Sequence, residues 1–139
     1  MSITISRFTI NAYDEVISLW KDCEGIGFSD ADSKENIQKQ LERNPGMSFV
    51  AYDNSKLVGA VLCGHDGRRG YIHHLGVYQD YRRQGIARSL IIKCLSMLAS
   101  VGIQKCHTFV FNNNTDGVNF WESIGWSQRM DISVLSKMI

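Results

Sequence analysis

The sequence predicts an α/β domain with a central mixed sheet of about six strands, mostly antiparallel, and four helices on both faces. Its apolar pattern alternates between periods of 2 and 3.6 in the order β-α-α-β-β-β-α-β-α-β. Short polar turns join the middle strands, which predicts antiparallel hairpins. A strand at residues 71–77, a helix at 85–101 and a strand at 105–111 form a crossover, so those two strands are expected to be parallel. Residues 1–139 therefore form a single predicted domain.

Composition limits the classes of function. The chain has 139 residues, of which 44% are hydrophobic and 21% charged, and its net charge of +1 argues against a general nucleic-acid binder. No apolar run approaches the ~20 residues of a membrane span, and the N-terminus lacks the basic and apolar pattern of a signal peptide. The cysteines form no CxxC pair and lie in apolar segments, so we expect buried, reduced thiols in a cytoplasmic protein. These are Cys23, Cys63, Cys94 and Cys106.

The first third of the chain reads as one strand and two helices. Alternating apolar and polar residues from Ile3 predict a short strand, and apolar residues at helical spacing predict a helix over residues 11–23. Asp32 followed by Glu35 has the spacing of a capping box. The helix that begins there should end before Pro45, because proline disfavours helical geometry in the residue that precedes it.

The middle of the chain predicts three consecutive strands. Residues 47–52 and 57–63 read as a hairpin, and a turn rich in glycine and charge leads into the strand at 71–77. Under strict alternation, unless a bulge changes the parity, this strand has two faces. Tyr71, His73, Leu75 and Val77 lie on one face, and Ile72, His74 and Gly76 on the other.

The last third begins with the clearest helix of the sequence, at residues 85–101, which has a continuous apolar stripe. A strand at 105–111, a polar loop and a short helix at 117–124 follow. A final strand is predicted at 126–135. The start of the long helix follows a basic loop, and its first backbone N–H groups have no partner within the helix. It therefore suits a phosphate or pyrophosphate, although an ordinary helix start after a basic loop gives the same pattern.

Two motifs carry a resemblance to a known family. Arg82-Arg83-Gln84-Gly85-Ile86-Ala87 has the form RxxGxA, and N-x-x-G-V-x-F-W-x-x-x-G-W starts at Asn114. With a strand that ends in Leu-Gly-Val before them, they resemble the GNAT superfamily of N-acetyltransferases, in particular its small bacterial members. The resemblance extends over nearly the whole chain. It implies the GNAT fold, in which the parallel pair of strands splays apart, and acetyl-CoA as the acetyl donor. No metal is expected, because the histidines lack the spacing of zinc ligands.

The resemblance also assigns a coenzyme site. The backbone of residues 75–77 would bond the pantetheine amides, with an N–H near Leu75 facing the thioester carbonyl, and the amides of 83–88 would hold the pyrophosphate. Asn114 either holds pantetheine or caps the following helix. The expected coenzyme-binding residues are Leu75, Gly76, Val77, Arg82, Arg83, Gln84, Gly85, Ile86, Ala87, Arg88 and Asn114.

The implied reaction is direct attack of a neutral primary amine on the acetyl thioester in a ternary complex, which requires a base. Tyr71 occupies the position of a glutamate base in some relatives, and His73 on the same face is the expected base, unless it is structural. Trp121 replaces the tyrosine that often serves as the acid. Either the thiolate leaves without an acid, or water or Tyr78 supplies the proton.

The acceptor is predicted only by class, as a small-molecule amine or a peptide amine. Carboxylates between residues 24 and 35 either attract a cationic amine or form a solvated loop. We expect no nucleic-acid, membrane or metal partner, and a monomer or homodimer. Two other functions compete: a catalytically weak or inactive acyl-CoA-binding or sensing module, and a nucleotide-binding α/β protein. The GK[ST] ending of a P-loop is missing, which argues against the second.

Overall fold

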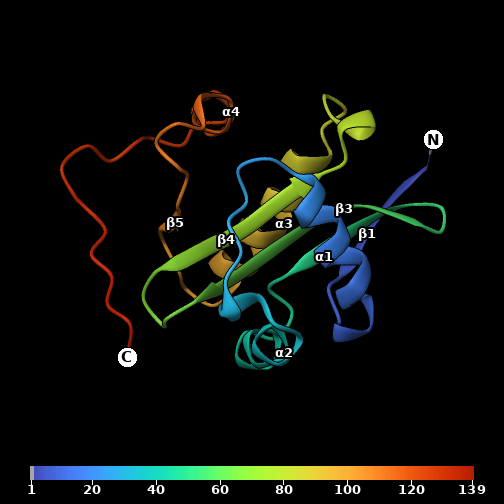
Figure 1. The fold of residues 1–139 in the computed structure, drawn as a ribbon, viewed down its shortest axis with the longest axis horizontal. Coiled ribbons are helices and arrows are strands. Elements are labelled where there is room, and N and C mark those ends of the chain that lie inside the picture. The colour runs from blue at the N-terminus through green and yellow to red at the C-terminus, as the bar shows by residue number, and fades with distance from the viewer. Residues whose placement is uncertain (1) are drawn as a thin grey trace. The chain divides into compact units, whose positions relative to one another are not determined.

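The computed structural model of the protein describes residues 2–139 (Figure 1). The chain divides into two compact units, Met1–Phe109 and Val110–Ile139. The single-domain assignment stays a prediction. No helix in the described residues has the length and apolar character needed to cross a membrane.

The first unit holds the sheet and three of the α-helices. Its elements, in chain order, are β1 (Ile3–Arg7), α1 (Tyr13–Asp22), α2 (Lys34–Arg43), β2 (Phe49–Asp53), β3 (Lys56–His65), β4 (Gly70–Val77), α3 (Ile86–Ser100) and β5 (Cys106–Thr108). Three short 3-10 helices lie between them: η1 (Ile10–Ala12), η2 (Asp30–Asp32) and η3 (Gln79–Tyr81). The second unit holds α4 (Thr115–Ser123).

The sheet has the strand order β1-β2-β3-β4-β5. Its first three pairs are antiparallel and β4 pairs with β5 in parallel, which confirms the predicted mixed sheet and the crossover through α3. The parallel pairing covers only Gly70 to Ile72 of β4. Among the described residues, no strand therefore pairs with residues 73–77 on that side of β4.

The predicted strand at 126–135 is wrong, so the sheet has five strands instead of about six. Residues 126–139 contain no strand, and apolar side chains there, such as Ile132 and Leu135, are exposed. Alternation supplies an apolar face, but a strand also needs a neighbour for its backbone hydrogen bonds. The unit that contains this segment has no strand of its own to pair with it.

Helices cover both faces of the sheet in the first unit, with α1 in front of β4 and α3 behind it (Figure 1). Trp20 of α1 and Cys23, the residue that follows this helix, lie against Gly76, where a Cβ atom would come 2.9 Å from the Cys23 sulfur. On the other face, Ile86 and Leu90 of α3 lie 3.2 Å from the Cβ position of Gly59. The lack of side chains on these glycines lets both helices pack close to the strands that form the candidate site.

Candidate functional site

The end of β4 has an unpaired edge. The N–H of Tyr78 donates to the Val58 carbonyl of β3 at 3.0 Å. Backbone groups alternate in direction along a strand, so the N–H and C=O groups of Leu75 and Val77 point away from β3. That side of β4 has no strand beyond Ile72 among the described residues. This edge can therefore accept another extended chain of amide groups.

The start of α3 offers a row of free donors. Gly85 is its N-cap, with φ of +81°, and no side chain caps it. None of the described residues accepts a hydrogen bond from the backbone N–H groups of residues 83–88. The first turn contains no acidic residue, and a Cβ at Gly85 would meet no atom within 4 Å. Free amides, the positive end of the helix dipole and open space together fit a bound anion such as a pyrophosphate.

The arginines of this loop have different environments. Arg82 Nε donates to the Val77 carbonyl at 2.9 Å, and its Nη2 lies 3.9 Å from the Cys23 sulfur. Arg83, with φ of +62°, and Arg88 are exposed. Arg82 therefore fastens the loop to the end of β4, whereas Arg83 and Arg88 leave their charges available to a ligand.

A β-bulge in β4 changes the predicted faces. Leu62 of β3 pairs with His74, whereas Cys63 pairs with Ile72, so His73 is the extra residue. The Cβ position of Gly70 points toward α3, because it meets Leu98 of that helix. Ile72, two residues further along the strand, points toward the same side. His74 shares the α1 face with Gly76 instead, and its ring lies 5.0 Å from that of Trp20. Strict alternation, which put Ile72 on the face of His74 and Gly76, is therefore wrong across the bulge.

The two predicted catalytic side chains, Tyr71 and His73, stack on each other, with ring centroids 6.1 Å apart and planes 12° apart. Tyr71 also contacts the rings of His107 and Phe109. His73 is exposed, yet its crowded surroundings lower the pKa of its ring, chiefly by desolvation and then by the neighbouring His74. A lowered pKa keeps the ring neutral at neutral pH, as a base requires.

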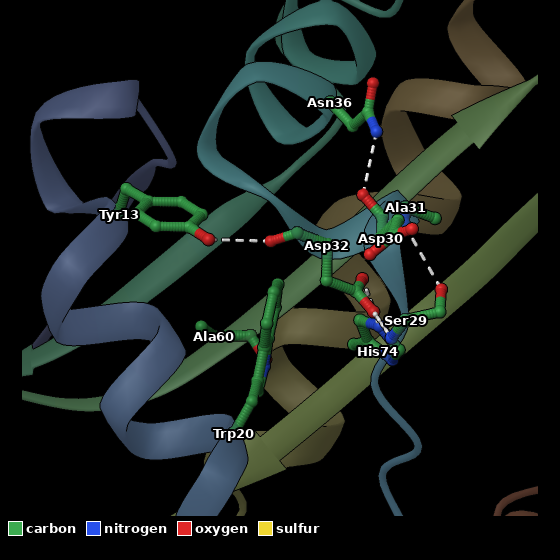
Figure 2. A network of polar contacts seen from close by, with 9 residues as sticks. All are labelled: Tyr13, Trp20, Ser29, Asp30, Ala31, Asp32, Asn36, Ala60 and His74. Carbon is green, nitrogen blue, oxygen red and sulfur yellow. Dashed lines mark hydrogen bonds and ion pairs between the residues drawn. The ribbon is translucent and has the colours of Figure 1, made fainter.

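A network that sequence reasoning did not find joins β4 to η2. His74 Nε2 lies 2.8 Å from Asp32 Oδ1, and Asp32 Oδ2 accepts from the Ser29 N–H at 3.1 Å. The Tyr13 hydroxyl donates to the Asp32 carbonyl at 2.7 Å. Figure 2 shows Asp32 reaching from η2 to His74, with Trp20 of α1 beside the pair. Ser33, not Asp32, caps α2, because its hydroxyl accepts from the Asn36 N–H.

The second unit contains Asn114 and Trp121. Asn114 caps α4, since its Oδ1 accepts from the Gly117 N–H at 3.0 Å. Trp121 is 9% exposed, and its ring lies 4.5 Å from that of Trp126. Of the two roles predicted for Asn114, the structure confirms the helix cap. The contact of Asn114 with pantetheine stays a prediction.

Comparison with known proteins decides the family. Residues 13–126 match the model of the acetyltransferase (GNAT) family. The chain belongs to the GNAT family. An acetyltransferase of Pectobacterium atrosepticum is 31% identical to this GNAT chain over 135 residues, with 97% of this chain and 94% of that protein covered. An acetyltransferase of Sodalis glossinidius is 30% identical with the same coverage.

Solved structures share the GNAT fold. The PaiA N-acetyltransferase of Thermoplasma acidophilum, in complex with coenzyme A, has a TM-score of 0.80 and 20% identity, with 91% of each chain covered. An aminoglycoside acetyltransferase from a soil metagenome, in complex with sisomicin, has a TM-score of 0.76 and 20% identity, with 99% of this chain and 96% of that chain covered. The predicted family and fold are thus confirmed, and the GNAT chain is an acetyl-CoA-dependent acetyltransferase.

The GNAT structure brings some predicted residues together and adds others. Residues 82–88 and the unpaired part of β4 are adjacent through the Arg82 bond to Val77. His74 and Asp32 are the additions; the sequence signalled them only separately, through the possibility of a bulge in the strand at 71–77 and through the carboxylates between residues 24 and 35. Among the described residues, no group of three His, Cys, Asp or Glu side chains is placed to hold a metal ion.

Proposed function

We propose that this GNAT enzyme moves the acetyl group of acetyl-CoA onto a primary amine by direct attack in a ternary complex. The observation that carries the proposal is the row of unpartnered amides at residues 83–88, fastened beside an unpaired strand edge by Arg82. The first feature suits the pyrophosphate of coenzyme A and the second suits its pantetheine arm.

Each part of the coenzyme has a proposed partner. The amides of residues 83–88 bind the pyrophosphate, and Gly85 leaves room for its close approach. Arg83 and Arg88 add positive charge. The outward-facing C=O of Leu75 and N–H of Val77 bond the pantetheine amides, because Arg82 occupies the Val77 carbonyl, and Gly76 between them stays paired to β3 through Ala60. Asn114 adds a side-chain contact to pantetheine.

The proposed chemistry balances without a further reactant. The amine nitrogen attacks the thioester carbon, the C–N bond forms, and the C–S bond then breaks. One amine proton passes to a base, and the coenzyme leaves as its thiolate or thiol. A thiolate is a good leaving group, since its conjugate acid has an ordinary pKa of about 8.5, so the tryptophan at position 121 removes no essential step. The Leu75 N–H faces the developing oxyanion.

The acceptor is proposed as a small-molecule amine or the amine of a peptide. Structures with the same fold include the aminoglycoside acetyltransferase described above and a ribosomal-protein-S18-alanine N-acetyltransferase of Escherichia coli, so both acceptor classes occur on this scaffold. All four cysteines are free thiols in this structure. This agrees with a reducing compartment, and we place the enzyme in the cytoplasm, as a monomer or homodimer.

Two measurements test the proposal. Coenzyme A should raise the thermal unfolding midpoint by several degrees, because a ligand at 100 times its Kd stabilises the folded state by about 2.7 kcal/mol. Thiol release from acetyl-CoA should accelerate with at least one of spermidine, sisomicin, free lysine or a peptide with an N-terminal alanine. Binding of coenzyme A without turnover of any amine would instead indicate a sensing module, and the absence of both would overturn the proposal.

Charge variants locate the coenzyme site. Arg83→Glu should weaken coenzyme A binding roughly tenfold, because it places a negative charge beside the proposed pyrophosphate site. Arg68→Glu makes the same charge change in the exposed turn between β3 and β4 and should leave binding unchanged. Equal effects of the two variants would show that the loop before α3 is not the site.

A further inference from the structure

We infer that His74 takes the proton of the attacking amine and that Asp32 is the positioning residue that fixes its ring. This inference rests on the proposed function and deepens it, because it names the base. Asp32 lies in the connection between α1 and α2, so that connection supplies part of the catalytic arrangement as well as a cover for the sheet.

The pair is close and sheltered. His74 Nε2 and Asp32 Oδ1 are 2.8 Å apart, and the two side chains are only 15% and 10% exposed. Asp32 is itself held in place, since its Oδ2 accepts from the Ser29 N–H within a capping box around η2. A carboxylate fixed at both oxygens can hold an imidazole ring in one orientation.

The bond to Asp32 determines the tautomer. A carboxylate only accepts hydrogen bonds, so Nε2 of His74 carries the hydrogen and Nδ1 carries the lone pair. Nδ1 has no hydrogen-bond partner among the described residues. Because no side-chain nitrogen or oxygen there is both fully buried and unpartnered, Nδ1 is accessible to solvent. The ring is therefore oriented with its basic atom open and its other nitrogen fixed.

The neighbours of His74 hold the ring without competing for the proton. Trp20 contacts it edge-on at 5.0 Å and Phe28 lies 5.9 Å away, with ring planes at 60° and 37°. Two titratable neighbours act on the pair: Tyr13 bonds to Asp32, and His73 interacts electrostatically with both His74 and Asp32. The Tyr13 hydroxyl donates to the Asp32 carbonyl, and its pKa is raised chiefly by burial, so it stays protonated.

His74 also lies next to the proposed thioester site on β4. The peptide that joins it to Leu75 contains the N–H proposed to face the thioester oxygen. In the proposed step, the amine nitrogen bonds to the thioester carbon and gives its proton to Nδ1 of His74. The ring becomes a cation, Nε2 keeps its hydrogen, and the Asp32 carboxylate stabilises the new charge. The ring then returns the proton to solvent or to the leaving sulfur.

His73 lacks this support. Its ring is exposed and stacks on Tyr71, and no carboxylate of the described residues forms a hydrogen bond or ion pair with it, although Asp32 acts on it electrostatically. His73 nevertheless remains the alternative candidate for the base, because both histidines belong to the same strand. The experiment must therefore separate the two.

The test compares variants in the thiol-release assay, with the amine that gives the greatest turnover in the panel above. His74→Gln keeps an N–H that can donate to Asp32 but has no basic nitrogen, so kcat should fall roughly 100-fold. Asp32→Asn should lower kcat about tenfold. The double variant should be no slower than His74→Gln alone, because Asp32 acts through His74. The KM for acetyl-CoA should stay within about twofold throughout, and His65→Gln, at the distant β3–β4 turn, is the matched histidine control.

Three outcomes decide the inference. The inference is supported if the activity of His74→Gln no longer declines at acid pH while coenzyme A still raises the thermal unfolding midpoint of this variant. Full activity of His74→Gln, or a loss confined to His73→Gln, overturns it and favours the competing histidine. A wild-type enzyme that acetylates no amine fails the proposed function instead, so the two failures are distinct. Where a variant unfolds, its missing thermal shift reveals this, and His74→Asn then replaces it in the same comparison.

Discussion

Arg82 holds the end of its own strand: its Nε donates to the Val77 carbonyl at 2.9 Å, five residues back along the chain. This bond closes the turn through η3 and fixes where α3 begins relative to β4. It also occupies a backbone carbonyl at the strand edge that we propose for pantetheine. In the sequence, Arg82 resembles a phosphate ligand. In the folded protein, its bond to Val77 first of all anchors the loop to the end of β4.

Replacing this anchor should cost stability. Arg82→Ala should lower the free energy of unfolding by about 1–2 kcal/mol, because hydrogen bonds from charged donors contribute that much and this side chain is partly exposed. Arg83→Ala should change it by less than about 0.5 kcal/mol, since that side chain is exposed and has no polar partner among the described residues. Urea denaturation measures both, and equal stabilities of the two variants would contradict the anchoring role.

Asn114 allows its two roles to be separated. Asn114→Asp keeps the oxygen that accepts from the Gly117 N–H, so α4 should remain capped. Asn114→Ala removes the cap and should destabilise the protein by about 1 kcal/mol. If the amide N–H group also holds pantetheine, both variants should weaken coenzyme A binding, although only one destabilises. Calorimetric titration alongside thermal unfolding distinguishes the roles, and unchanged affinity in Asn114→Asp would leave the cap as the whole role.

The thiols should be unreactive in the folded protein. Burial raises the pKa of Cys106 to about 12, and hydrogen bonding and burial among neighbouring thiols raise the pKa of Cys94 strongly. Only the thiolate reacts with alkylating reagents, so at pH 8 the reactive fraction of Cys106 is roughly a thousandfold below that of an ordinary cysteine. Mass spectrometry after iodoacetamide treatment should find these residues unmodified in the native protein and modified in urea. Rapid labelling of the native form would contradict this packing.

The lowered pKa of His73 has a consequence for stability. The folded state binds a proton at this ring less readily than the unfolded chain does, so the unfolded state gains more protons as pH falls below about 6.5. The stabilising contribution of neutral His73 is therefore complete above that pH and declines at lower pH. Because the ring is exposed, the effect should be small. His73→Gln should flatten the dependence of unfolding free energy on pH between 5 and 7, and an unchanged slope would contradict the shift.

Local patterns were sufficient for most of the fold. The crossover through α3 follows from one apolar stripe between two strands, and the antiparallel strands follow from polar turns. The prediction of a final strand was wrong because periodicity shows which face of a segment is apolar. It does not show whether a neighbouring strand is present to form the backbone hydrogen bonds. Residues 126–139 illustrate this limit: they alternate well and pair with no strand in the described part of the chain.

The candidate site was predicted unevenly for a related reason. The start of α3 could be found because a helix N-terminus and Gly85 are local features. The contact between Asp32 and His74 joins residues 42 positions apart in the sequence, and it depends on one extra residue in β4. No periodicity carries that information, since a bulge reverses side-chain direction without altering the residue types around it.

The extra residue at His73 affects how residue roles can be transferred between members of the family. In a relative whose strand lacks the bulge, every residue aligned after His73 would project from the opposite face of the strand. An alignment without a one-residue gap there would equate groups that project from opposite faces. Inferring a base in such relatives by position alone would then assign the role to a side chain packed against the wrong helix.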